Sequence, residues 1–168
     1  MSMLTNILRK AALLGFFIAF MACISEDGQD PSGSAEEFSG EVAGVGSISA
    51  SKDFDTISGT KISAAGATIV MMQGTDNSGK GFMLRITTYN GTGTYDLGFT
   101  NIANTATFIE GISAGQQYST AYQGTSGKIT VTVDDGKRLE GTFEFVGKVN
   151  NTSAARTVTN GKFKVNLQ

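Results

Sequence analysis

The chain has 168 residues, with 13 basic and 15 acidic side chains, a net charge of −2, one cysteine and no histidine or tryptophan. This length fits one domain, and a lone cysteine excludes an intramolecular disulfide. Because no basic excess is present to neutralise phosphates, we expect no nucleic-acid partner. The 22 glycines, together with many Ser, Thr and Asn residues, favour short strands and tight turns over helices.

Residues 1–22 have the pattern of a secretory signal peptide. Arg9 and Lys10 form a positive start, and an apolar run of 12 residues follows from 11 to 22. In a helix this run rises about 18 Å, which falls short of the roughly 30 Å hydrocarbon core of a bilayer. We therefore predict a helix over 4–21 that serves targeting and belongs to no folded domain.

Cys23 follows the apolar run directly. Residues 20–23, Phe-Met-Ala-Cys, resemble the lipobox of bacterial lipoproteins. The resemblance implies cleavage before Cys23, attachment of lipid such as palmitate to that residue, and anchorage of the chain in a membrane. The alternative is an ordinary signal peptide that ends near a cysteine by chance.

A flexible tether is predicted over 23–40. Residues 24–41 contain Asp and Glu but no Lys or Arg, and they cannot bury enough apolar surface to order themselves. Ser25-Glu26-Asp27 resembles the signal that exports lipoproteins of the Bacteroidota to the outer face of the outer membrane. That resemblance implies a lipid-anchored protein exposed on the cell surface. A soluble spacer repelled by anionic lipids is an equal alternative.

Beyond the tether, hydrophobic and polar residues alternate as in half-buried strands. Clear examples are 82–87, 129–134, 139–145 and 162–167. Hairpins are predicted over 67–88, around a loop from Gly74 to Gly81, and over 128–147, around a turn at 134–137. Further strands are expected near 47–51, 61–65, 93–99, 105–110, 117–123 and 156–160.

About nine short strands at this spacing predict an all-β domain over 41–168, arranged as an antiparallel β-sandwich. The inward positions are bulky and would fill the interior. This favours the sandwich over the alternative, a closed, lipocalin-like barrel with a ligand cavity. Phe143 and Phe145 are predicted to point inward from one face of a sheet.

Three segments carry a family resemblance: Gly-Thr-Tyr-Asp-Leu-Gly at 93–98, the stretch from 127 to 145, and Thr-Asn-Gly-Lys-Phe at 159–163. They resemble an uncharacterised family of Bacteroidota lipoproteins with a single β-rich domain of unknown function. The resemblance covers most of 45–168. The resemblance implies a β domain. It implies no activity, because the family has no established one.

Two motifs that would carry chemistry lack the surroundings they need. Residues 111–115 match G-x-S-x-G, but that serine requires a histidine base and the chain has none. The loop at 74–81 approaches a phosphate-binding loop, yet Gly81 replaces the metal-binding hydroxyl and a strand follows instead of a helix. Asp134 and Asp135 are expected to be solvated turn carboxylates. We therefore predict no enzyme, no cofactor and no metal site.

Binding is the use that remains. Tyr118 and Tyr122 are predicted to share one face of a strand, as a small platform for sugars or as the edge of the core. Residues 55–57 resemble the motif at which exported Bacteroidota proteins are O-glycosylated, which implies modification of Thr56. We expect a cell-envelope lipoprotein that is a non-enzymatic binding or structural module with a protein or glycan partner. The alternatives are a glycan-binding surface domain and a carrier of an apolar ligand in a barrel.

Overall fold

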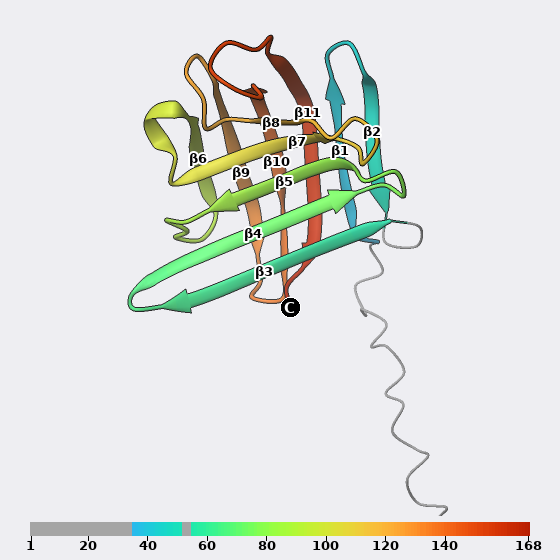
Figure 1. Ribbon diagram of the computed structural model, residues 1–168. Helices are drawn as coiled ribbons and strands as arrows, with labels where there is room; N and C mark the ends of the chain where they lie inside the picture. The colour runs from blue at the N-terminus through green and yellow to red at the C-terminus, as the bar shows by residue number, and fades with distance from the viewer. Residues whose placement is uncertain (1–34, 52–54) are drawn as a thin grey trace, which may run out of the picture. The chain divides into compact units, whose positions relative to one another are not determined.

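Two antiparallel β-sheets face each other in the computed structural model, which describes residues 35–51 and 55–168 (Figure 1). Sheet A has six strands in the order β2-β1-β11-β10-β9-β6, and sheet B has five in the order β3-β4-β5-β7-β8. Both sheets are open, so the predicted sandwich is confirmed and the closed barrel is wrong. The predicted targeting helix and Cys23 lie outside the described residues.

Sheet A is built from β1 (Glu37–Val42), β2 (Gly46–Ser51), β6 (Gly93–Gly98), β9 (Ser126–Asp134), β10 (Arg138–Gly147) and β11 (Arg156–Asn166). Sheet B is built from β3 (Thr56–Ala64), β4 (Ala67–Thr75), β5 (Lys80–Ile86), β7 (Asn104–Glu110) and β8 (Gln117–Ser119). A 3-10 turn, η1 (Phe99–Asn101), follows β6. In Figure 1 the long strands of sheet B cross in front of those of sheet A, as in orthogonally packed sandwiches.

The first strand begins earlier than the sequence indicates. β1 starts at Glu37 and pairs with both β2 and β11, so the predicted domain boundary at residue 41 falls inside it. Phe38 and Val42 are buried while Glu37 and Glu41 are exposed. Two apolar residues at the correct spacing suffice to bury one face of a strand, even within an acidic segment. Residues 37–40 of the predicted tether are therefore part of the sandwich.

Both predicted hairpins are confirmed. β4 and β5 are joined by a turn in which Asp76 Oδ1 accepts hydrogen bonds from the backbone N–H groups of Ser78 (2.8 Å) and Lys80 (2.9 Å). β9 and β10 are joined by a turn in which Gly136 has a φ of 83°, a conformation that glycine adopts without strain. Asp76 and Gly136 therefore stabilise the two turns through a side-chain hydrogen bond and a glycine backbone conformation, respectively.

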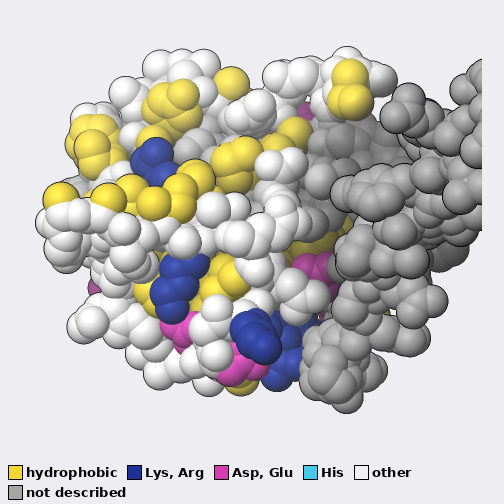
Figure 2. Space-filling view, turned by 90° about the horizontal axis from the view of Figure 1, so that it is seen from below, with side chains coloured by type: hydrophobic (Ala, Val, Ile, Leu, Met, Phe, Trp, Pro, Cys, Tyr) yellow, Lys and Arg dark blue, Asp and Glu magenta, His cyan; other side chains and the backbone are white. Residues whose placement is uncertain are grey.

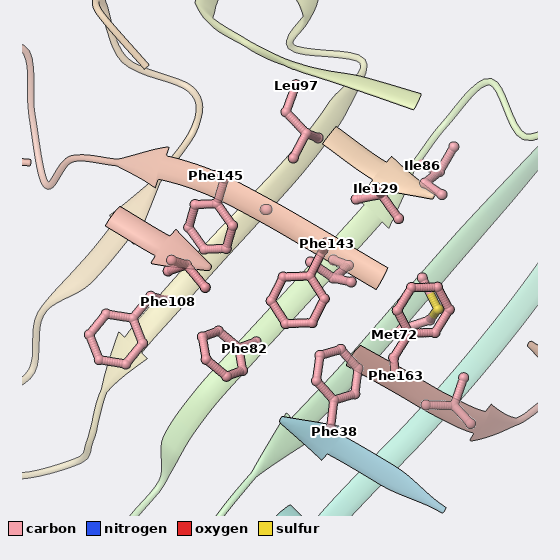
Figure 3. Close-up of a cluster of buried hydrophobic side chains, with 14 of the residues drawn as sticks. Phe38, Met72, Phe82, Ile86, Leu97, Phe108, Ile129, Phe143, Phe145 and Phe163 are labelled. Atoms are coloured by element: carbon pink, nitrogen blue, oxygen red, sulfur yellow. The ribbon is translucent and has the colours of Figure 1, made fainter. Parts of the chain in front are cut away.

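Phenylalanine rings from both sheets fill the interior (Figure 3). Phe82 of sheet B lies 5.1 Å from Phe143 and 6.3 Å from Phe38 of sheet A, measured between ring centroids. Phe143 and Phe145 are at most 3 % exposed, which confirms that both point inward. Burying a side chain of this size stabilises a fold by about 1.5–3 kcal/mol. The core therefore consists of aromatic contacts across the gap between the sheets.

The described domain has its own core. Residues 35–168 form one unit, and it contains the hydrophobic cluster of the described residues. Within the described residues, no helix combines the length and the hydrophobicity that a membrane span requires.

Candidate functional site

Near the end of β9, the alternation of inward and outward side chains shifts by one residue. Val131 pairs with Gly141, but Val133 pairs with Glu140, so no residue of β10 lies opposite Thr132 in the strand register. A bulge of this kind adds one residue to the strand, and the positions beyond it change faces. Asp134 therefore points between the sheets and Val133 is only half-buried. The alternation that predicted an inward Val133 and a solvated Asp134 fails here because of the bulge.

Asp134 connects the two sheets. Its Oδ2 atom lies 2.7 Å from Nζ of Lys61 in β3 and accepts a second hydrogen bond, also 2.7 Å, from the Tyr89 hydroxyl. Nζ of Lys61 lies 5.1 Å from the centroid of the Tyr89 ring, within range of a cation–π contact. The Tyr89 ring stacks on Tyr95 at 5.6 Å. We call Lys61, Tyr89 and Asp134 the Asp134 latch.

The charges of this latch are mutually stabilised. Burial alone would raise the pKa of Asp134, but hydrogen bonds from Lys61, Tyr89 and the Gly136 N–H outweigh it and hold the pKa below its usual value. Burial, followed by the hydrogen bond to Asp134, raises the pKa of Tyr89. At neutral pH the carboxylate is therefore ionised and the tyrosine keeps its proton. The tyrosine cannot serve as a base in that state.

A second latch of similar composition lies at the opposite end of β10 and β11. Nη2 of Arg156 in sheet A lies 3.6 Å from Oε1 of Glu110 in sheet B, and the guanidinium carbon of Arg156 lies 5.3 Å from the centroid of the Tyr118 ring. Tyr118 in turn stacks on Phe108. We call Glu110, Tyr118 and Arg156 the Glu110 latch. Each latch joins the sheets by a cation, a carboxylate and a tyrosine.

The two tyrosines predicted as a sugar platform lie in different surroundings. Tyr118 is 7 % exposed and belongs to the core. β8 ends at Ser119, so Tyr122 lies beyond the strand in a turn and shares no strand face with Tyr118. Thr56 is exposed at the first position of β3.

The two chemical motifs lie in loops. Residues 111–115 form the connection between β7 and β8, and the Ile112 N–H donates to the Ser78 carbonyl in the β4–β5 turn. Residues 74–81 form that turn and the strand ends beside it. Among residues 35–51 and 55–168, no three ligating side chains gather closely enough to hold a metal ion.

The outer face of sheet A is charged and hollowed. Lys128 pairs with Glu144 at 3.2 Å, and Glu140 pairs with Lys164 at 3.3 Å, which forms a ladder across β9, β10 and β11. Beside it lies a groove of about 340 Å³ lined by Lys128, Thr142, Phe143, Glu144, Asn160, Gly161 and Lys162. This face presents hydrogen-bond donors and acceptors to solvent.

The outer face of sheet B differs in chemistry. Its most exposed apolar side chains are Ile62 (48 %), Met71 (42 %) and Met83 (42 %). Figure 2 views the molecule from below the orientation of Figure 1. Hydrophobic side chains lie along the upper half of this view, whereas the acidic side chains and most basic ones lie mainly in the lower half. We call the outward side chains of β3, β4, β5 and β7 the apolar face of sheet B.

A family model described as a domain of unknown function matches residues 44–165, from the turn after β1 almost to the end of β11. No curated protein and no solved structure matches the chain. The domain-of-unknown-function part of the sequence resemblance is therefore confirmed. Its lipoprotein and taxonomic parts stay predictions.

Proposed function

The chain belongs to the DUF6252 family of domains of unknown function, and we propose that it acts as a non-enzymatic binding or structural module of the cell envelope. The observation that supports this best is the contrast between a filled interior and two broad, chemically different outer faces. A rigid sandwich of this kind presents side chains to a partner without rearranging its core. The sites available for contact lie on the sheets' outer surfaces.

The polar groups between the sheets support the same proposal. In the Asp134 latch, Oδ2 of the carboxylate accepts bonds from both Lys61 and Tyr89, so this atom serves the contact between the sheets. In the Glu110 latch, Arg156 and Glu110 pair with each other. Ion pairs that connect two layers through packed aromatic rings are structural connections, and they explain the inward-pointing charges without a reaction.

The location in the envelope rests on the sequence. The signal peptide at 1–22 directs export, and acylation of Cys23 anchors the mature chain in the outer membrane. The acidic residues that follow are repelled by anionic lipids and would hold the sandwich tens of ångströms from the bilayer when extended. A partner at the cell surface is therefore a protein or a glycan and not a lipid headgroup.

Cysteine replacement and cross-linking in the native host test this proposal. Radiolabelled palmitate should enter the parent chain and not Cys23→Ala, and only the parent should sediment with outer membranes. An amine-reactive cross-linker applied to intact cells should give discrete adducts with the parent. Equal labelling of the parent chain and Cys23→Ala would contradict the proposed lipid anchor at Cys23. Turnover of any substrate in a hydrolase panel, lost on changing one carboxylate, would contradict the non-enzymatic role.

A glycan-binding role is the second candidate, and the groove on sheet A favours it. Thr142, Asn160 and Lys162 line this groove and are exposed, so they offer hydrogen bonds to hydroxyl groups. A glycan array probed with the full chain should show saturable binding that weakens in Lys162→Ala and persists in Lys137→Ala, a control in the β9–β10 turn. Binding that is equal in both variants would locate the glycan elsewhere.

A further inference from the structure

The apolar face of sheet B contains a single charged residue among its described side chains. Outward positions on β4 and β5 alternate with buried Val70, Met72, Phe82 and Leu84, which sets their direction. The outward positions with a side chain are Thr56, Ser58, Thr60, Ile62, Ala64, Ala67, Ile69, Met71, Gln73, Thr75, Met83, Arg85, Thr105, Thr107 and Ile109. No carboxylate is among them. This composition differs sharply from the ion-paired ladder on sheet A.

Arg85 lies within this apolar surface. It pairs with Met71 of β4 on one side and with Thr105 of β7 on the other, and Met83 precedes it by two residues on the same face. Arg85 is exposed, and it forms no ion pair with any residue that the structure describes. By contrast, Lys61 and Arg156 on the inner faces each pair with a carboxylate.

We propose that the apolar face of sheet B docks a protein partner through an apolar segment that carries a carboxylate, and that this carboxylate pairs with Arg85. The proposal rests on the binding role proposed above and names its surface. Arginine and exposed methionines are typical of protein interfaces, because the guanidinium binds a carboxylate through two hydrogen bonds and methionine adapts its shape to a partner. Thr60 on β3 and Thr107 on β7 flank the two methionines and offer hydrogen bonds beside the apolar contact.

The charge of the face distinguishes this occupant from a second copy of the chain. If two copies packed face to face through this surface, two guanidinium groups would be buried with no carboxylate on either face to pair with them. Burying unpaired charge is unfavourable. The partner must therefore bring the negative charge that this chain lacks there.

A membrane surface is also a poorer fit. Stable attachment to anionic lipids requires several basic residues, and aromatic side chains usually lie at the interface. The outward positions of β3, β4, β5 and β7 offer one arginine and no aromatic residue. A protein segment with apolar residues and one acidic residue matches this surface in composition and charge.

A displayed library of random 12-residue peptides provides the test. The library is panned against the immobilised full chain after counter-selection on the same support without it. We expect enriched peptides to combine Leu, Ile, Val or aromatic residues with Asp or Glu. Their affinity should fall at least tenfold in Arg85→Gln and in Met71→Thr/Met83→Thr, and it should be unchanged in Lys128→Gln on the opposite face. Circular dichroism should show that each variant keeps its fold.

Pairing the variants with altered peptides isolates the charge contact. Changing the peptide's Glu to Gln should weaken binding to the parent chain but cause no further loss in Arg85→Gln. The inference would be overturned if no peptide were enriched or if the enriched peptides lacked acidic residues. It would also be overturned if the peptide's Glu-to-Gln change and Arg85→Gln weakened binding independently. So would a dimer that dissociates in Met71→Thr/Met83→Thr during sedimentation, or binding to phosphatidylglycerol vesicles that Arg85→Gln abolishes. The cross-linking in cells decides the binding role separately.

Discussion

A Cβ atom added to Gly74 in β4 would lie 2.1 Å from the Cβ atom of Phe38 in β1. Phe38 of sheet A is therefore seated directly on the backbone of sheet B. The reciprocal contact is looser, since a Cβ atom on Gly40 would lie 3.0 Å from the ring of Phe82. These two strand glycines allow the aromatic layers to interlock.

Gly74→Ala should destabilise the protein by about 1–3 kcal/mol, the usual range for an overpacked core. Gly40→Ala should cost less, because a ring can shift more easily than the Cβ atom and backbone of Phe38. Urea unfolding of the full chain measures both free energies. An equal or smaller loss for Gly74→Ala would show that the sheets separate readily at this point.

Phe143→Ala or Phe145→Ala should each cost about 3–5 kcal/mol, as expected for a buried phenylalanine. Both rings lie within the aromatic cluster, 6.3 Å apart. Thr142→Ala, which changes an exposed position between buried neighbours on the same strand, should alter stability by about 0.5 kcal/mol or less. The same urea titration compares the three. A loss below about 1 kcal/mol at both phenylalanines would contradict their packing.

The Asp134 latch should make the free energy of unfolding depend on pH. The pKa of Asp134 in the folded chain is lower than its ordinary value of 3.8, so the unfolded chain binds the proton more readily. The stabilisation is therefore complete above that ordinary value and is lost as the pH falls towards the folded pKa. Asp134→Asn should unfold more easily at pH 7 and lose stability less steeply on acidification.

Asp76 and Asp135 also have lowered pKa values, so Asp134→Asn should keep part of the slope. In Asp76, burial is outweighed by hydrogen bonds from Ser78 and Lys80. Thermal unfolding at a series of pH values between about 5 and 2 measures the effect. Identical slopes for the parent and Asp134→Asn would mean that the carboxylate is not stabilised by the latch.

Thr56 should carry an O-linked glycan in the native host. It is exposed at the start of β3, and its motif with Asp55 and Ile57 motivates the prediction. Intact-mass spectrometry should show additional mass on the parent chain and none on Thr56→Ala. Thr60→Ala, a change on the same strand outside the motif, should retain the additional mass. A parent chain of unmodified mass would contradict the prediction.

The sequence by itself determined the features that depend on neighbouring residues. Alternation at 82–87 and 139–145 indicated strands with one buried face, and it identified the inward side of Phe143 and Phe145 correctly. Turn residues such as Asp76 and Gly136 located both hairpins, because their side chains and backbone angles satisfy the turn locally. These patterns establish the all-β class and the two hairpins.

Only the tertiary structure decided which distant residues meet. Lys61 and Asp134 are 73 positions apart, and a bulge opposite β10 turns Asp134 inward, which simple alternation cannot anticipate. Likewise, β1 is a strand because β2 and β11 pair with it, although its own residues resemble a tether. The apolar face of sheet B arises from four strands brought side by side, β3, β4, β5 and β7. Pairing of the strands, a long-range property of the folded chain, places Arg85 between Met71 and Thr105.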